Sequence, residues 1–327
     1  MQIIATGSIA YDYLMRFPGK FSEHLLAEHL ENVSLSFLVD DMTKHWGGVA
    51  ANIAYSMALL GLRPKLMGTA GRDFPDYRQW LESHGVDCST VKQIDSVFTA
   101  SFFCNTDLEN NQIASFYAGA MGLAGGYTLA EAYDGQPDLV IVSPNDPHAM
   151  SNIARECREQ GIRFIYDPSQ QVPRLTGEEL ARDLAGAHVL ITNKYESEVI
   201  CQKTGKTLDE IRGMVDILVI TNGKSGSVIY DNRGDAPKHS EVEAFPANDI
   251  KDPTGGGDAY RAGFIYGLVN DWPLEIAAQV GSLSATYCIE QVGTQTHHYT
   301  PAEFVARYRR HYDDNGVLNT LLENTRV

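Results

Sequence analysis

The sequence predicts an α/β fold in which a mostly parallel sheet is covered by helices on both faces. Four short and almost wholly apolar segments occupy residues 138–143, 162–167, 188–193 and 216–221, and stretches with helical periodicity separate them. Apolar runs of this length between helices are typical of parallel strands that are buried on both sides. A chain of 327 residues with 43% hydrophobic content can also bury a large core. We therefore expect one main α/β unit with an appended element.

The N-terminal part is expected to contain strands and helices, which one segment without regular helical periodicity interrupts. Residues 3–6 form a short apolar strand, and the strand 65–71 leads into a helix over 74–84. Helical periodicity is mostly absent from 13–46, where the alternation of residues 35–39 predicts a strand. We expect this segment to lie outside the main sheet.

A β-hairpin is predicted from two strands, 99–104 and 113–117, that a polar turn connects. Phe102 and Phe116 can face the same side of this hairpin. Paired aromatic residues usually belong to a core, but on a hairpin with little else to cover they could hold a flat ligand. The hairpin thus predicts either a small core or a ligand site.

The C-terminal third is expected to complete the sheet and to supply long helices. Two short strands, 228–230 and 242–245, flank a turn at 232–235, and a long helix is expected over about 274–290. An amphipathic helix over 301–312 precedes a polar tail.

Composition and charge exclude several classes of function. The formal net charge is −16, and an acidic surface repels both nucleic acid and anionic membranes. No apolar run approaches the ~18 residues of a membrane span, and the first residues lack the basic segment of an export signal. The five cysteines are scattered and never form a CxxC pair, so we expect thiols in a reducing cytoplasm.

The stretch 252–258, DPTGGGD, carries the clearest chemical signal. Its glycines, Gly255–Gly257, precede an apolar run that reads as the start of a helix. The unpaired N–H groups and the dipole at a helix start favour a bound phosphate. Asp258 lies at the same helix start, where the dipole should keep it ionised, so it could accept a proton from a hydroxyl. The stretch predicts phosphoryl transfer to an alcohol, and the alternative is a glycine-rich turn that only caps a helix.

Polar side chains follow the predicted strands at the edge where open parallel sheets bind ligands. Ser8 and Asp12 follow the first strand, although a lone Asp more often caps or solvates a loop. Asn193 and Glu196 are three residues apart across a strand-to-helix junction, so their side chains can converge. Glu196 could hold water on a Mg²⁺ ion, and the same spacing also fits a capping box.

A second glycine pair, Gly47 and Gly48, precedes a helix pattern that runs to Gly61. Glycines before a helix allow another close approach of the backbone to a ligand. Asn52, one turn into this helix, should point its amide back toward the helix start. The alternative is a helix that packs tightly on the sheet and meets no ligand.

Three motifs together resemble the ribokinase-like carbohydrate and nucleoside kinases, the PfkB family. DPTGGGD resembles the family signature D-x-T-G-x-G-D, the glycine pair followed by Asn52 resembles its early signature, and NKYE at 193–196 resembles its N-x-x-E motif. The order and spacing of the three motifs agree along nearly the whole chain. One departure is Gly256, which stands where the family more often has alanine.

This resemblance implies a ribokinase-like three-layer α/β/α sandwich with a mostly parallel central sheet and a small β-sheet lid. The core domain would comprise residues 1–12, 47–94 and 121–327, and the discontinuous lid would comprise 13–46 and 95–120. In related bacterial enzymes such lids pair in a homodimer. Pairing would suit a small sheet with apolar residues on both faces, because one face would otherwise stay uncovered.

Within the family, the chain looks most similar to bacterial-type adenosine kinases, through segments such as SLSFLVDD, ASFYAGAM and DPSQQ. Carried over to this sequence, the resemblance makes Asp258 the base and Gly255–Gly257 the anion hole. The implied nucleoside contacts are Ser8, Asp12, Ser36, Gly47, Gly48, Asn52, Phe102, Phe116, Gln170 and Gln171. The implied ATP contacts are Asn193, Thr221, Asn222, Gly223, Lys224, Ser225 and Gly226. Glu196 would organise Mg²⁺, and Asp252 and Thr254 would lie near a K⁺ ion.

The resemblance implies the reaction of an adenosine kinase, in which ATP phosphorylates the ribose 5′-hydroxyl of adenosine to give AMP and ADP. Alternatives within the same fold are a kinase for ribose or fructose and a kinase for inosine or guanosine, and the donor could be ADP. A non-catalytic ligand-binding protein is the alternative from another class. The base, the glycines and the N-x-x-E motif argue against it, because a degenerate relative would be expected to have lost one of them.

Overall fold

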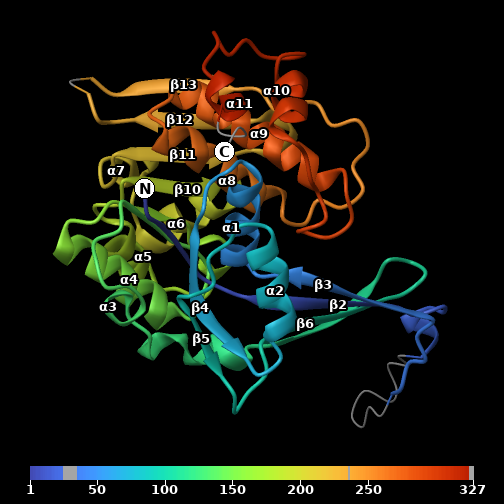
Figure 1. The fold of residues 1–327 in the computed structure, drawn as a ribbon. Coiled ribbons are helices and arrows are strands. Elements are labelled where there is room, and N and C mark those ends of the chain that lie inside the picture. Colours follow the sequence, from blue (N-terminus) through green and yellow to red (C-terminus); the bar gives the residue numbers. More distant parts are fainter. Residues whose placement is uncertain (25–34, 235, 324–327) are drawn as a thin grey trace.

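The computed structural model describes residues 1–24, 35–234 and 236–323, and within these ranges the chain forms a nine-stranded and a four-stranded sheet (Figure 1). The strands of the large sheet follow the order β13-β12-β11-β10-β9-β8-β1-β4-β5. They span Ile3–Thr6 (β1), Lys65–Gly71 (β4), Val91–Ile94 (β5), Leu139–Val142 (β8), Phe164–Tyr166 (β9), Val189–Asn193 (β10), Ile217–Thr221 (β11), Ser227–Asp231 (β12) and Lys238–Val242 (β13). From β5 to β11 all neighbours pair in parallel, and β12 and β13 add antiparallel strands. The mostly parallel sheet is confirmed.

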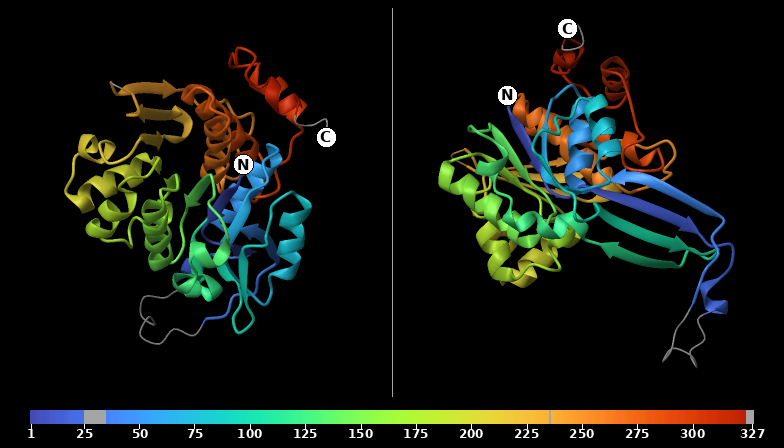
Figure 2. Two further views of the ribbon diagram at one scale, coloured as in Figure 1. Left: turned by 60° about the vertical axis from the view of Figure 1, so that its left-hand side comes forward. Right: turned by 60° about the horizontal axis from the view of Figure 1, so that its bottom comes forward.

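Helices cover both faces of the large sheet (Figure 2). The buried side chains of β1 alternate, since Ile3 and Ala5 belong to one hydrophobic cluster and Ile4 to another. The first cluster includes residues of α1 (Val49–Leu59), α2 (Pro75–Ser83), α8 (Gly256–Val269) and α9 (Leu274–Ile289). The second includes residues of α4 (Pro147–Gln160), α5 (Gly177–Leu184), α6 (Lys194–Thr204) and α7 (Leu208–Arg212). These two clusters make the molecule a three-layer α/β/α sandwich, as predicted.

Further helices lie at the edges of the sandwich. They are α3 (Leu129–Ala132), α10 (Pro301–Tyr308) and α11 (Asn319–Glu323). A third hydrophobic cluster joins α10 and α11 to the ends of α8 and α9. Within the described ranges, none of the helices combines the length and hydrophobicity that a bilayer-spanning segment needs. The five cysteines are free thiols.

The small sheet projects from the edge of the sandwich (Figures 1 and 2). Its order is β3-β2-β6-β7, with strands at Ala10–Arg16 (β2), Asp41–Gly47 (β3), Ala100–Thr106 (β6) and Gln112–Tyr117 (β7). Strands β6 and β7 are antiparallel, which confirms the predicted hairpin. Residues 25–34 of the predicted lid lie outside the described residues.

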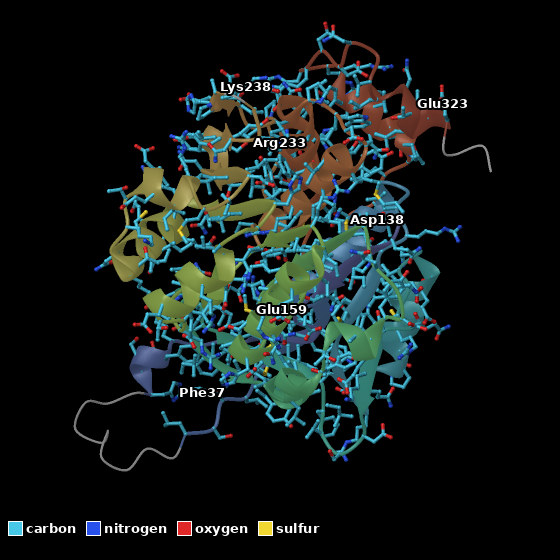
Figure 3. The ribbon with its side chains drawn as sticks, turned by 90° about the vertical axis from the view of Figure 1, so that its left-hand side faces the viewer. Phe37, Asp138, Glu159, Arg233, Lys238 and Glu323 are labelled. Atoms are coloured by element: carbon cyan, nitrogen blue, oxygen red, sulfur yellow. The ribbon has the colours of Figure 1, made fainter. Side chains whose placement is uncertain are left out.

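The predicted strand at 35–39 is wrong. These residues belong to no helix or strand of the described structure, and the strand of the small sheet is β3, which begins at Asp41. Phe37 instead packs edge-on against Phe17 and Phe21, with 5.0 Å between ring centroids in each case. Figure 3 shows Phe37 at the end of the molecule opposite to Glu323. An alternating pattern at 35–39 therefore reflects a local aromatic cluster rather than sheet pairing.

Two C-terminal boundaries also differ from the predictions. The strand expected at 242–245 is β13, which ends at Val242, because the N–H of Phe245 donates to Oγ of Ser282 (2.7 Å) instead of to a strand. The predicted turn at 232–235 includes residue 235, which lies outside the described residues. The helix expected over 301–312 ends at Tyr308.

Candidate active site

A cleft of about 1460 Å³ lies between the small sheet and the carboxyl ends of the large-sheet strands. It contains loop residues that follow β1, β8, β9, β10 and β11, and the strand order reverses beside β1. Ligands of open α/β sheets bind at such a reversal. Of the residues that the sequence analysis selected, the lining contains Ser8, Asp12, Gly48, Asn52, Phe102, Phe116, Gln170, Gln171, Asn193, Glu196, Thr221, Gly223, Asp252, Thr254, Gly255, Gly257 and Asp258.

Asp258 lies in the first turn of α8, where its Oδ2 accepts a hydrogen bond from Nδ2 of Asn52 (2.9 Å). This bond directs the Asn52 amide toward the start of α8, whereas the prediction concerned the start of its own helix, α1. Burial raises the pKa of Asp258, whereas the Arg261 guanidinium and the Asn52 hydrogen bond lower it. The net shift is opposite to the one expected from the helix dipole alone, because desolvation of the carboxylate is the larger effect. A raised pKa makes Asp258 a stronger base once it is ionised.

The three glycines before Asp258 differ in their surroundings. Gly255 is the N-cap of α8 at φ 79°, a conformation that favours glycine, and both Gly255 and Gly257 line the cleft. Gly256 does not line it: its N–H donates to the Pro253 carbonyl oxygen (3.3 Å), and a Cβ there would meet the Ile289 side chain at 2.7 Å. The predicted anion hole therefore has two of its three glycines at the cleft.

A buried ion pair beside these glycines was not predicted. Nη2 of Arg261 donates to Oδ1 of Asp167 (2.6 Å), and Nε of Arg261 lies 2.5 Å from Oδ2 of the same carboxylate. Asp167 is fully buried at the end of β9, and Arg261 is 6% exposed. Nη1 of Arg261 reaches the backbone of Gly257, since a Cβ there would lie 2.7 Å from it. Arg261 thus brings a positive charge to the wall of the cleft, and its spacing from Asp258 in the DAYR segment was the available signal.

Ser8 and the Gly47–Gly48 pair connect β1 to the start of α1. Oγ of Ser8 accepts the N–H of Val49 (2.9 Å), and Gly48 is the N-cap of α1 at φ 92°. A Cβ on Gly48 would lie 2.6–2.7 Å from backbone atoms of residues 8–10. Gly47 does not line the cleft, and its carbonyl oxygen accepts the hydroxyl of Tyr77 (2.8 Å). Both glycines therefore pack closely against other parts of the chain, Gly47 with its Cα beside the Asp12 carboxylate, and Gly48 in addition lines the cleft.

The small sheet contributes Asp12, Phe102 and Phe116 to the cleft. Phe102 pairs in register with Asp12 on one side and with Phe116 on the other, so the three side chains share one face. Burial, together with smaller effects of the nearby carboxylates of Asp252 and Asp258, raises the pKa of Asp12 to about 6. Ser36, by contrast, does not line the cleft; it is exposed and lies next to Phe37 in the aromatic cluster.

The ends of β9, β10 and β11 contribute mainly amide side chains. Gln170 is exposed, whereas Gln171 is 6% exposed and its Oε1 has no hydrogen-bond partner among the described residues. After β11, Thr221 and Gly223 line the cleft, but Asn222, Lys224, Ser225 and Gly226 do not. Gly226 is buried at φ 86°, and a Cβ there would lie 1.9 Å from the Val242 carbonyl oxygen. Close packing between the start of β12 and the end of β13 therefore requires glycine at this position.

Asn193 and Glu196 form the capping box that was one interpretation of their spacing. Oε2 of Glu196 accepts the backbone N–H of Asn193 (2.8 Å), and Oε1 accepts its Nδ2 (2.7 Å). In the exposed boxes at Thr176 and Thr207, a single glutamate oxygen accepts both bonds. Glu196 differs from these also because it is 7% exposed and faces the cleft.

Each Glu196 oxygen retains a lone pair, so the donor set fits a Mg²⁺ ion that is held through water. No group of three or more His, Cys, Asp or Glu side chains suited to a metal occurs among the described residues. Asp252 already accepts the N–H groups of Thr254 (2.9 Å) and Gly293 (3.1 Å). Asp252 therefore shapes the loop before α8.

The chain is similar in sequence to known kinases over nearly its whole length. The family model described as pfkB family carbohydrate kinase matches residues 7–301. The nucleoside kinase of Methanothermobacter thermautotrophicus is 31% identical over 310 residues, which cover 94% of this chain and 95% of that protein. The nucleoside kinase of Methanocaldococcus jannaschii is 28% identical over 312 residues, with coverage of 95% and 97%.

The chain is also similar in structure to a solved nucleoside kinase. The Burkholderia thailandensis nucleoside kinase in ligand-free form matches with a TM-score of 0.84 at 36% identity, covering 94% of this chain and 100% of that chain. The same enzyme in complex with inosine matches with a TM-score of 0.82 at 36% identity, covering 95% and 98%. The chain therefore belongs to the pfkB family of carbohydrate kinases, which are phosphotransferases that act on hydroxyl groups.

Proposed function

We propose that the protein is an ATP-dependent nucleoside kinase that phosphorylates the 5′-hydroxyl of a purine nucleoside. The observation that carries this proposal is the position of Asp258, hydrogen-bonded to Asn52, in the same cleft as the aromatic pair Phe102 and Phe116. A carboxylate suits the abstraction of a hydroxyl proton, and aromatic side chains suit a nucleobase. The nucleoside kinases among the relatives support the same class.

Gln171 supports a substrate that brings a hydrogen-bond donor into the cleft. Its buried and unpartnered Oε1 needs a donor, because a buried polar atom without a hydrogen bond is costly. A purine offers such a donor on its six-membered ring, at N6 of adenine or N1 of hypoxanthine. Adenosine is the first candidate, through the segments that resemble adenosine kinases. Inosine is the second, because the Burkholderia thailandensis enzyme, at 36% identity, was solved with inosine and with ADP-inosine.

In the proposed reaction, the nucleoside O5′ attacks the γ-phosphorus of ATP, the bond from that phosphorus to the β,γ-bridging oxygen breaks, and ADP leaves. Asp258 accepts the 5′-hydroxyl proton. The N–H groups at Gly255 and Gly257 and the charge of Arg261 stabilise the phosphoryl oxygens. Asp12, which also lines the cleft, is proposed to bind the ribose hydroxyls. Thr221, Gly223 and Asn193 line the same cleft and are proposed to contact ATP.

Two cations belong to this proposal. Mg²⁺ bound with the nucleotide would neutralise phosphate charge, and Glu196 with Asn193 would hold its water ligands. A K⁺ ion near Asp252 and Thr254 is proposed from the family resemblance. Rates measured in KCl and in choline chloride test this site: equal rates would remove it.

The small sheet is proposed to act as a lid, with the domain boundaries given above, and to pair with a second copy of the chain. Its outer face carries Met42, Phe103, Ile113 and Tyr117, all of them exposed by at least 39%, and Tyr13 stacks on Phe103. The edges β3 and β7 are unpaired among the described strands. Sedimentation of the wild type and of Phe103→Lys tests the dimer, and a monomeric wild type would overturn it.

The direct test of the activity is a panel of adenosine, inosine, guanosine, ribose and fructose with MgATP, read as ADP formation and as phosphorylated product. We expect nucleosides to be turned over at least tenfold faster than either sugar at equal concentration. Replacing ATP by ADP, with AMP formation as readout, tests the donor. Phosphorylation of ribose or fructose alone would assign the chain to the sugar kinases, and no turnover of any acceptor would favour the non-catalytic alternative.

Phe102→Ala tests whether Phe102 binds the nucleobase, and Phe103→Ala is its matched control on the opposite face of the same strand. Stacking on an aromatic side chain contributes about 1–3 kcal/mol per base. We therefore expect Phe102→Ala to raise the nucleoside KM about 5- to 150-fold and Phe103→Ala to leave it within about twofold. An unchanged KM for Phe102→Ala would show that Phe102 does not bind the base.

A further inference from the structure

A chain of directed hydrogen bonds runs behind the cleft from Trp80 to Asp258. The indole N–H of Trp80 donates to Oε1 of Gln295 (3.2 Å), and Nε2 of Gln295 donates to Oδ1 of Asn52 (2.9 Å). Nδ2 of Asn52 then donates to Oδ2 of Asp258 (2.9 Å). Gln295 is 2% and Asn52 is 5% exposed, so bulk water does not compete for these groups.

The direction of this chain is set by Trp80. An indole N–H can only donate, so it selects the oxygen end of the Gln295 amide. The two hydrogens on Nε2 of Gln295 then face two acceptors, Oδ1 of Asn52 and the hydroxyl of Tyr77 (2.5 Å). The Tyr77 hydroxyl can accept this bond because its own hydrogen goes to the Gly47 carbonyl oxygen (2.8 Å).

The Asn52 amide is held in one orientation as a result. Its Oδ1 faces Nε2 of Gln295 and also lies 2.9 Å from the hydroxyl of Thr294, which is 2.8 Å from the Trp46 carbonyl oxygen. If the amide turned over, its NH₂ group would face the NH₂ group of Gln295, and its oxygen would face the Asp258 carboxylate. Both contacts would leave buried polar groups without partners, which is costly.

We propose that Gln295 is a positioning residue of the kinase: it holds the Asn52 amide so that Asn52 donates to Oδ2 of Asp258, which leaves Oδ1 free to accept the substrate proton. This inference rests on the proposed function. Neither Gln295 nor Thr294 belongs to the family motifs that the sequence contains, and Gln295 lies 243 positions from Asn52 in the chain.

The orientation has a chemical consequence for the base. The charged and titratable groups that act on Asp258 include Arg261 on its own helix, Glu196 on α6, Asp12 on β2, Asp167 after β9 and the Cys288 thiol on α9. Burial raises the pKa of Asp258, and the Asn52 hydrogen bond opposes that effect because it favours the ionised carboxylate. Without Gln295 the amide can rotate, so we expect a less ionised base and a less defined position for it.

The test compares Gln295→Met with wild type, using the preferred acceptor and MgATP. We expect kcat to fall about tenfold or more, the nucleoside KM to stay within about threefold, and the acid limb of kcat/KM to move up by about 0.5 pH unit or more. Gln279→Met is the matched control, since Gln279 accepts the Tyr308 hydroxyl away from the cleft and should change none of these. A folded Gln295→Met protein with wild-type kcat and acid limb would overturn the proposal.

A double-mutant comparison separates positioning from general structural damage. In the Asn52→Ala background, Gln295→Met should reduce kcat by less than about twofold, because the residue through which it acts is gone. A further tenfold loss there would contradict the proposal. If Gln295→Met does not fold, Trp80→Phe takes its place: it removes the fixed donor, should lower kcat and raise the acid limb, and would contradict the proposal if both stayed unchanged. An inactive wild type would count against the proposed function itself, not against this hydrogen-bond chain.

Discussion

Helices α1 and α8 both begin at a glycine with positive φ, both begin at the cleft, and neither has a side-chain cap on its N-cap residue. At α1 the protein itself fills the space: Ser8 accepts the N–H of Val49, and a Cβ on Gly48 would collide with backbone atoms at 2.6–2.7 Å. At α8 a Cβ on Gly257 would meet only the end of the Arg261 side chain within 3 Å.

This difference shows that a position before a helix can require glycine for two separate reasons. At α1 the glycine is required because the backbone of the strand connection packs against it. At α8, Gly255 and Gly257 line an open cleft, where the N–H groups of a helix start favour an anion. A Cβ on Gly255 would in addition lie 2.9 Å from the Thr294 side chain. The two helix starts meet through the Asn52–Asp258 hydrogen bond. One start is therefore expected to govern stability and the other catalysis.

The largest effect is expected from Asp258→Asn, which keeps the shape of the side chain and removes the base. Positioned general bases contribute about 10²–10⁴ in rate, so kcat should fall by that factor. The nucleoside Kd, measured by calorimetry, should change by less than about threefold. A variant with near wild-type kcat would remove Asp258 from the role of base.

Gly48→Ala should be the largest effect on stability. The positive φ and the collision with backbone together should cost about 2–4 kcal/mol in the free energy of unfolding. Gly61→Ala is the matched control, because Gly61 has φ 93° and nothing within 4 Å of an added Cβ, so it should cost only about 1 kcal/mol. Denaturant melts of both variants measure the difference, and equal losses would refute the packing explanation.

Gly257→Ala should show the reverse behaviour. The added Cβ would meet Nη1 of Arg261, whereas Nε and Nη2 make the contacts to Asp167, so the buried ion pair can stay formed and the free energy of unfolding should fall by only about 1 kcal/mol. The added methyl group would crowd Nη1 of Arg261 and the backbone proposed to bind phosphate, so kcat should fall about 10- to 100-fold. Gly213→Ala, whose nearest contacts are 3.6 Å and lie away from the cleft, should leave kcat unchanged. If Gly257→Ala lost stability markedly and kept its kcat, the glycines at the starts of α1 and α8 would both be required for packing, and the proposed difference between them would be wrong.

The smallest expected effect concerns Asp12 on the lid side of the cleft. Its pKa of about 6 lies above the unfolded value, so its ionisation destabilises the fold as pH rises through 4–6, and the full cost is present above pH 6. Asp12→Asn should therefore increase the free energy of unfolding at pH 8 by about 1 kcal/mol and change it little at pH 4. It should also raise the nucleoside KM at pH 8. Thermal melts at the two pH values check the sign, and a lower stability at pH 8 would contradict it.

Local patterns in the sequence were sufficient for most of the fold. The apolar strand segments and the glycines before α1 and α8 were predictable because each depends on residues that are near in the chain. The strand predicted at 35–39 failed because Phe37 packs into the Phe17–Phe21–Phe37 cluster while Leu35 and Leu38 are exposed. An alternating apolar pattern indicates which side chains tend to be buried, but it does not indicate which part of the protein covers them.

For the site, the sequence by itself determined which chemical groups are present: the carboxylate of Asp258, the glycines before α8, the amide and carboxylate of the capping box, and the aromatic pair. Only the tertiary structure decided how these groups are held. The Arg261–Asp167 pair and the bonds from Gln295 to Asn52 join positions 94 and 243 residues apart. The direction of a buried hydrogen bond is fixed by whichever donors and acceptors the fold packs around it, and no local pattern in the chain records those neighbours.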